Sequence, residues 1–159
     1  CVYGCDRCQD VCPRNSAWKA QELSENQRAY AKKDHFDLRR LLHMDVEYFK
    51  ANIQPHMFYM SSRNLWKWKM NVARAMGNSK DRSYVSDLIR AFNENDDERL
   101  RGMIAWALGR LGGQEAREAL EQFKSFSSGI VLAEIEGALR CRLQFFTSEP
   151  WKNDKSESR

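Results

Sequence analysis

The sequence contains few residues that interrupt helices, with three prolines and eight glycines among its 159 residues. It also lacks a sustained alternation of β-branched and aromatic residues with polar ones, so strands are not expected to dominate. Many Ala, Leu, Glu, Arg and Lys residues favour helix instead. Hydrophobic residues make up 42% and charged residues 30%, which is the balance of a protein with a packed core. We therefore predict an all-α fold.

Signals for membranes and secretion are absent from this sequence. No stretch approaches the ~18 consecutive apolar residues of a membrane span, and no signal peptide is present. We therefore expect a cytoplasmic monomer with no membrane partner. The net charge of +4 is compatible with an acidic partner but does not require one. Because the first residue is Cys1 rather than Met, the chain is interpreted as a fragment of a longer protein.

Cysteine is concentrated at one end of the chain. Four of the five cysteines, Cys1, Cys5, Cys8 and Cys12, form the string C-x3-C-x2-C-x3-C-P, and Cys141 stands apart. A disulfide framework is not favoured in a chain without a secretion signal. Zinc is an alternative for the C-x2-C pair, but a zinc ribbon has its second pair many residues later, and none follows.

An iron–sulfur site fits the cysteine string best. The part from Cys5 to Pro13 matches the bacterial ferredoxin pattern, in which the last cysteine binds the other cluster of a pair. We therefore predict Cys5, Cys8 and Cys12 as ligands of [4Fe–4S] clusters whose other ligands lie upstream of Cys1. Cys1 departs from the pattern by one residue, so it is a ligand in a stretched loop or an accidental neighbour. Cys141 is predicted to be a buried structural cysteine.

The rest of the chain is expected to be a connector followed by helices. We divide it into a partial ferredoxin-type motif (1–15), a linker with short helices (16–60), helical repeats (61–147) and a disordered tail (148–159). Asp37, Asp45, Asp81 and Asp97 are the expected N-caps. The expected helices cover residues 37–43, 45–53, 64–77, 81–92, 97–111, 114–124 and 129–146, with Gly77 as a C-cap.

An internal repeat indicates how these helices are arranged. Residues 72–77 (VARAMG) align with 104–109 (IAWALG) at an offset of 32, and a weaker third copy lies at 135–139. A period near 30 residues with two helices in each copy is typical of an α-solenoid, in which neighbouring pairs stack to bury their apolar faces. The fold class predicted is therefore a short HEAT-like α-solenoid preceded by part of a ferredoxin-like iron–sulfur segment.

One expected helix carries a basic face. At 100° per residue, Arg63, Lys67 and Arg74 lie within about 40° of one another, opposite the apolar stripe, and Trp66 flanks them. These three residues are candidate contacts for RNA phosphates. The alternative is an ordinary solvated helix face. The isolated His35, His43 and His56 are interpreted as surface or capping residues, and the acidic run 96–98 as a turn with an N-cap.

Taken together, these features resemble the epoxyqueuosine reductases. Residues 3–15 (YGCDRCQDVCPRN) resemble the second cysteine motif of that family. Residues 63–78 and 96–113, including the run ALGRLGG at 107–113, resemble its HEAT-like repeats. The resemblance spans roughly residues 3–145. It does not extend to Cys1, because the corresponding cysteine of the family lies well upstream.

The resemblance implies a cobalamin-dependent enzyme with two [4Fe–4S] clusters, which reduces the epoxide of epoxyqueuosine in tRNA to queuosine. On this basis Cys5 and Cys8 bind one cluster and Cys12 the other, the partners are tRNA and an external electron donor, and the clusters supply electrons to the cobalt. The cobalamin domain and the catalytic acid are not in this chain, so no catalytic residue is predicted and the chain alone is expected to be inactive. The alternatives are a non-catalytic HEAT-like scaffold with a structural metal, or a relative of the reductive dehalogenases, which the helical repeat disfavours.

Overall fold

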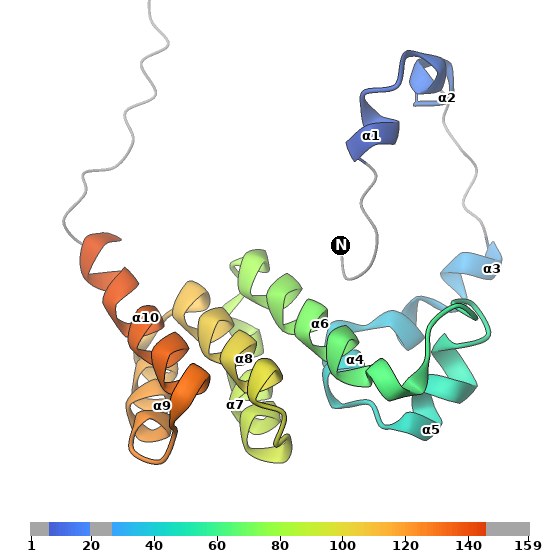
Figure 1. The fold of residues 1–159 in the computed structure, drawn as a ribbon. Coiled ribbons are helices and arrows are strands. Elements are labelled where there is room, and N and C mark those ends of the chain that lie inside the picture. Colours follow the sequence, from blue (N-terminus) through green and yellow to red (C-terminus); the bar gives the residue numbers. More distant parts are fainter. Residues whose placement is uncertain (1–6, 20–26, 146–159) are drawn as a thin grey trace, which may run out of the picture.

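The computed structural model describes residues 7–19 and 27–145. In these two segments all regular secondary structure is helical, and no strand occurs. The all-α, solenoid-like fold predicted from the sequence is therefore confirmed (Figure 1). In the described part of the chain, no helix has the length and apolar character needed to cross a membrane.

The described N-terminal part of the chain consists of short helical turns. Its elements are α1 (Arg7–Asp10), η1 (Pro13–Asn15), α2 (Ser16–Lys19), α3 (Gln27–Tyr30), η2 (Lys33–Phe36), α4 (Leu38–His43), α5 (Val46–Tyr48), η3 (Phe49–Ile53) and η4 (Ser62–Asn64). Two of them begin at predicted caps. The Asp37 carboxylate accepts hydrogen bonds from the Arg39 and Arg40 amides, and the Asp45 carboxylate accepts one from the Tyr48 amide. The predicted helices at 37–43 and 45–53 are thus present.

Longer helices form the repeat region. They are α6 (Leu65–Ser79), α7 (Val85–Glu94, preceded by η5, Arg82–Tyr84), α8 (Glu98–Leu111), α9 (Gln114–Lys124) and α10 (Gly129–Phe145). Helices α6, α8 and α10 lie side by side as one layer, and α7 and α9 pack against it as a second layer (Figure 1). Helix α4 contacts both α6 and α7, and so continues the second layer toward the N-terminus.

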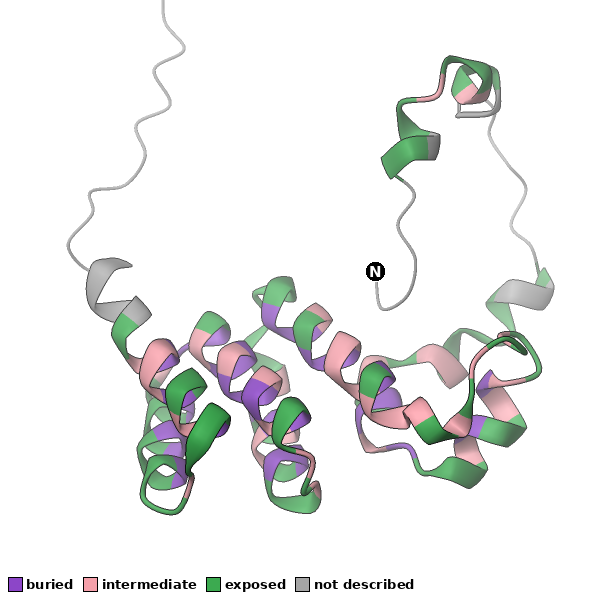
Figure 2. Cartoon of the chain, in the orientation of Figure 1, coloured by how far each residue is buried: buried purple, intermediate pink, exposed green. Residues whose placement is uncertain are grey.

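The hydrophobic core lies between the two layers. Each helix of the repeats buries one stripe of side chains, and Figure 2 shows the buried residues recurring along these helices. Trp68, Phe92 and Phe123 are among the largest side chains that are almost completely buried. The Phe92 and Phe123 rings stack with their centroids 3.8 Å apart and their planes at 5°. This pair joins α7 to α9 and therefore one helical repeat to the next.

Gly77 is not the C-cap that the sequence predicted. Helix α6 continues to Ser79 and ends at Lys80, which has the left-handed conformation (φ 63°) expected of a C-cap. Gly77 lies inside the helix and is buried against α8. A Cβ atom at this position would lie 2.9 Å from the Ala107 Cα atom. The glycine thus allows the two helices to approach closely and does not end α6.

The sequence indicated that His43 is an isolated residue, but the structure shows that it has charged partners. Its Nδ1 atom lies 2.8 Å from a Glu94 carboxylate oxygen, and its Nε2 atom lies 3.7 Å from an Asp87 carboxylate oxygen. The same Asp87 accepts hydrogen bonds from Arg39 at 2.9 Å and from Arg90 at 3.2 Å. This network of charged side chains fastens α4 to α7, and the paired residues of the two helices lie 44 to 51 positions apart in the sequence.

Candidate functional site

Two predicted cluster ligands lie in the first described segment. Cys8 is exposed on α1, and Cys12 is half-exposed at the start of η1; both are free cysteines. The Val11 amide donates to the Arg7 carbonyl at 3.3 Å, which completes the helical turn between them. Cys12 then leaves the helix with an extended backbone (φ −72°, ψ 120°), and Pro13 begins the next turn.

These two thiols fit the donor set that an iron–sulfur cluster requires, because cluster ligands are cysteine thiolates that iron can reach. Cys1 and Cys5 lie outside the described residues, as does the Cys141 side chain. In the part of the chain that the structure describes, no three His, Cys, Asp or Glu side chains form a metal site. The ligand assignment of Cys5, Cys8 and Cys12 therefore stays a prediction.

The three predicted RNA contacts occupy two elements. Arg63 lies on η4, whereas Lys67 and Arg74 are exposed on α6. The Lys67 ammonium lies 5.3 Å from the centre of the Trp66 ring. Because Arg63 precedes α6 in a separate 3-10 turn, the helical angle that relates it to Lys67 and Arg74 does not strictly apply.

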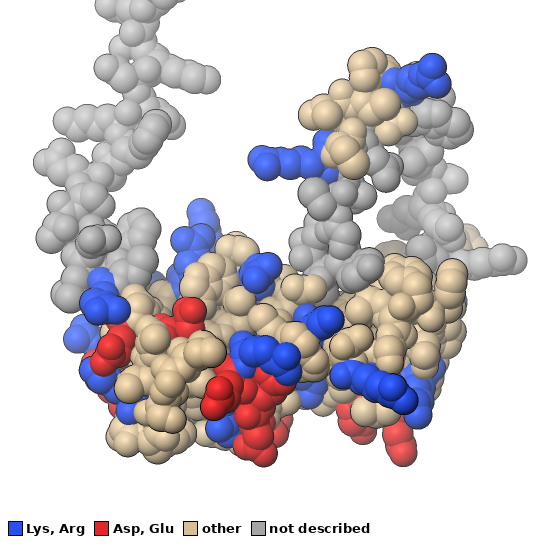
Figure 3. Space-filling view, viewed as in Figure 1, with Lys and Arg blue, Asp and Glu red and all other residues tan. Residues whose placement is uncertain are grey.

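Arg74 also lines a groove across the layer of α6, α8 and α10. The groove has a volume of about 440 Å³ and combines cationic, apolar and aromatic side chains. Its lining residues are Met70, Arg74, Arg99, Gly102, Met103, Trp106, Ile130 and Glu134. Figure 3 shows Lys and Arg side chains spread over this side of the molecule, with an acidic patch beside them. We refer to this feature as the Trp106 groove.

Arg99 is held in place at one wall of the groove. Its guanidinium carbon lies 3.5 Å from the centre of the Trp66 ring, and its Nη2 atom pairs with the Asp97 carboxylate at 2.6 Å. Asp97 also accepts hydrogen bonds from the Arg99 and Leu100 amides and so caps α8. The Arg99 side chain holds the pKa of Asp97 below its usual value, with further help from the two amides.

Replacing Asp97 with alanine is expected to lower the free energy of unfolding by about 1 kcal/mol at pH 7, because the cap of α8 is lost. The folded-state pKa of Asp97 lies below the unfolded value of 3.8. The stabilisation is therefore complete above pH 3.8 and is lost as the pH falls through the folded-state pKa. Urea denaturation across this range should show the difference between wild type and Asp97→Ala shrinking in acid. Asp97→Asn keeps the cap and should cost less at pH 7.

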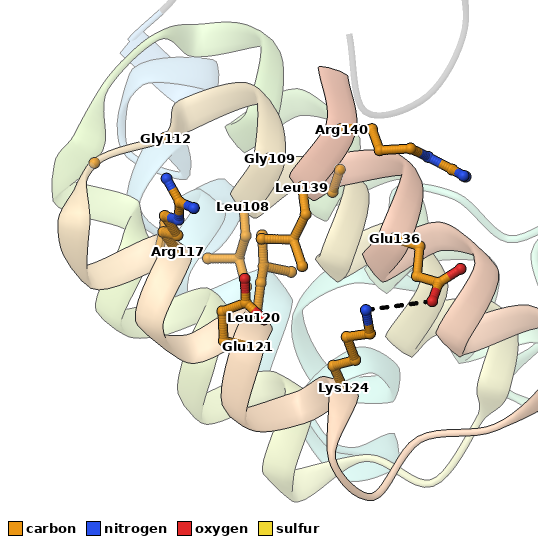
Figure 4. A pocket seen from close by; sticks show the side chains of 13 residues that line it. Leu108, Gly109, Gly112, Arg117, Leu120, Glu121, Lys124, Glu136, Leu139 and Arg140 are labelled. Carbon is orange, nitrogen blue, oxygen red and sulfur yellow. Dashed lines mark ion pairs between the residues drawn. The ribbon is translucent and has the colours of Figure 1, made fainter. Parts of the chain in front are cut away.

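A second hollow lies between α8, α9 and α10 (Figure 4). Its volume is about 500 Å³, and Leu108, Leu120 and Leu139 contribute to its apolar lining. Lys124 and Glu136 form an ion pair at 3.4 Å across its edge. No predicted site residue lines this hollow.

The Trp106 groove was not predicted from the sequence, because its residues come from three helices, α6, α8 and α10, that are separated in the chain by α7 and α9. One signal was available in the repeat itself. At the offset of 32, Trp106 aligns with Arg74, so both occupy the outward position of the same motif. A tryptophan at an outward position of an amphipathic helix is a candidate contact residue.

The comparisons with known proteins agree with this fold. The family model for HEAT repeats matches residues 61–140. A protein of Geobacillus stearothermophilus described as "Uncharacterized protein in gldA 3′ region" is 30% identical over 135 residues, which cover 76% of this chain and 55% of that protein. No solved structure matches the chain.

Several other relatives bear the name epoxyqueuosine reductase. The one from Bacillus cereus is 29% identical over 135 residues, covering 76% of this chain and 31% of the reductase. The one from Bacillus subtilis is 28% identical over 160 residues, covering 86% of this chain and 37% of the reductase. The resemblance seen in the sequence is thereby confirmed. The chain spans about a third of the length of these reductases.

Proposed function

The chain belongs to the HEAT-repeat family. Because several of its relatives are named epoxyqueuosine reductase, we propose that it is the C-terminal part of such a reductase and contributes to it in two ways. Its cysteine motif binds iron–sulfur clusters for electron transfer, and its repeats dock the tRNA that carries the modified base. The observation that carries this proposal is the occurrence of both features in one chain, a ferredoxin-type string at Cys5, Cys8 and Cys12 followed by HEAT repeats.

The exposure of Cys8 and Cys12 supports cluster binding, because both thiols are free and accessible to iron and sulfide. When bound, a [4Fe–4S] cluster supplies one-electron transfer. The chain's own contribution is to hold the thiolates in place, with the extended backbone of Cys12 separating its thiol from the helix that carries Cys8. The cobalamin implied by the family resemblance is not assigned to any residue of this chain.

The arrangement of cations on the α6–α8–α10 layer supports RNA docking. Lys67 and Arg74 are exposed on α6, and Arg74 and Arg99 both line the Trp106 groove. Cations at such positions bind phosphates without regard to base sequence. The acidic residues 96–98 at the start of α8 repel phosphates, so the docking surface is expected to centre on α6.

Cys8→Ala and Cys12→Ala are each expected to lower the iron and acid-labile sulfide bound by the anaerobically reconstituted reductase, because each removes a thiolate ligand. Iron and sulfide analysis of the purified protein measures this loss. Cys141→Ala is the matched control and should retain the wild-type content. A wild-type protein that binds stoichiometric zinc and no sulfide would contradict cluster binding and favour a scaffold with a structural metal.

Charge reversal at Lys67 and Arg74 should weaken tRNA binding by the reductase. If both residues contact phosphates, the double variant Lys67→Glu, Arg74→Glu should also reduce the slope of log affinity against log salt by about 2. Filter binding over a series of salt concentrations measures both effects. Lys50→Glu, an exposed change on η3, is the control. Wild-type affinity of the double variant at low salt would exclude docking through α6.

A further inference from the structure

We propose that the Trp106 groove is a binding site for an unpaired nucleobase, which stacks on Trp106 while Arg74 contacts the adjoining phosphate. This proposal rests on RNA docking by α6 and adds to it a site for bases. It predicts that the repeats distinguish a loop with accessible bases from a fully paired stem, which phosphate contacts alone do not do.

The geometry of Trp106 is the first support. Its indole is only half-buried, and it contributes to the lining of the groove. Gly77 makes room for it, because a Cβ atom at Gly77 would lie 3.0 Å from the Trp106 Cζ3 atom. The indole is thus held against α6 along one edge and supported by packing. A supported aromatic side chain at a groove suits stacking, which every base can supply through its π-face.

The size and lining of the groove are the second support. Its volume of about 440 Å³ falls within the range of small-ligand pockets, roughly 300–1,000 Å³. Met70, Met103 and Ile130 provide apolar surface, and Gly102 leaves space where a Cβ atom would meet the Glu134 side chain at 3.3 Å. A flat aromatic ring matches this lining better than a sugar or a phosphate does.

The charges decide between RNA and an apolar peptide as the occupant. Arg74 and Arg99 line the groove with one carboxylate, Glu134. Arg99 is already paired with Asp97 at 2.6 Å, so Arg74 is the lining cation that a phosphate would contact. Lys67 adds another cation beside Trp66, the residue that Arg99 covers. A nucleotide presents an aromatic ring and a negative charge together, and the groove presents an aromatic residue and cations together. A neutral amphipathic peptide would offer no negative charge to Arg74 and Lys67.

The test uses the full chain and two RNA probes, a hairpin with 2-aminopurine in a seven-nucleotide loop and a fully paired duplex of the same length. Wild type is expected to bind the hairpin more tightly and to quench the 2-aminopurine fluorescence through stacking. Trp106→Leu should lose about tenfold in hairpin affinity together with the quenching, and should keep its affinity for the duplex. Trp106→Phe should restore part of the quenching.

A second variant tests the site without disturbing the tryptophan. Ile130 is 62% exposed at the groove, so Ile130→Glu should fold normally and weaken hairpin binding by repelling the phosphate. Ile130→Gln removes the same apolar surface without adding a charge, so it should weaken hairpin binding less than Ile130→Glu. Val46→Glu, 40% exposed on α5, controls for the added charge.

Three results would count against the site. In the first, wild type binds hairpin and duplex with equal affinity, and the double variant Lys67→Glu, Arg74→Glu still binds both more weakly. This result would overturn the nucleobase site and leave RNA docking intact. No RNA binding by wild type at low salt would overturn both. A change of tryptophan emission with an uncharged amphipathic peptide that is lost in Trp106→Leu, with no such change for RNA, would assign the groove to a protein partner.

Discussion

Replacing Phe92 with alanine is expected to lower the free energy of unfolding by about 3–5 kcal/mol, because it leaves a cavity in the core between the two helical layers. Phe92 is completely buried, and its ring stacks on Phe123 with 3.8 Å between centroids. Phe126 contacts both rings edge-on, with centroids 6.4 Å from Phe92 and 5.9 Å from Phe123. The change therefore removes one ring of a three-ring cluster that connects α7 to α9.

Urea denaturation followed by circular dichroism measures this loss. Phe126→Ala is the matched control, because this ring belongs to the same cluster but is 59% exposed, and its removal should cost much less. In a solenoid each repeat is stabilised chiefly by its neighbours. Phe92→Ala should therefore also reduce the cooperativity of unfolding. Equal destabilisation by Phe92→Ala and Phe126→Ala would show that the stacking of Phe92 on Phe123 contributes little to the stability of the repeats.

The fold was predictable because its signals are local. Four aspartates lie directly before a helical turn, and each accepts a hydrogen bond from at least one backbone amide of that turn: Asp37, Asp45, Asp81 and Asp97. An N-cap followed by an amphipathic stripe needs only about ten consecutive residues to be recognised. The internal repeat then predicted that the helix pairs stack on one another, since the same motif recurs at an offset of 32.

Contacts between distant residues were not predictable in the same way. The C-cap expected at Gly77 was wrong because a glycine near the end of a helix reads the same whether it caps that helix or packs against another. His43 meets Asp87 and Glu94 only because α4 packs on α7. The cysteine motif, by contrast, is short enough to be recognised as a string, although the binding of a cluster stays a prediction.

The same reasoning applies to the candidate nucleic-acid surface. A helical wheel placed Lys67 and Arg74 on one face, and both are exposed on α6. It did not place Arg99 or Trp106 beside them, because a helical wheel describes a single helix, whereas the Trp106 groove is formed by three helices. The groove forms where the outward positions of successive repeats meet, so the register between repeats decides its composition.

Gly109 lies where α8 and α10 approach most closely among the glycine contacts of the described residues. Gly109→Ala is expected to lower the free energy of unfolding by about 1–3 kcal/mol, because the added Cβ atom would lie 2.6 Å from the Ala138 Cβ atom and 3.0 Å from its Cα atom. The second contact is with backbone, so relief requires a shift of α10 away from α8. Gly109 and Gly77 occupy the same position of the repeat motif, and Gly77 meets Ala107 in the same way.

Gly137 provides the matched control, since it lies inside α10 and a Cβ atom there would have no other atom within 4 Å. Gly137→Ala should therefore stabilise the protein by about 0.5–1 kcal/mol through helix propensity alone. Ala138→Gly, introduced together with Gly109→Ala, removes the clashing methyl group and should cost less than the sum of the two single changes. Thermal and urea denaturation of the four variants measure these differences. If Gly109→Ala were as stable as Gly137→Ala, the close approach of α8 and α10 would not be what this glycine provides, and the matching role of Gly77 between α6 and α8 would lose its support as well.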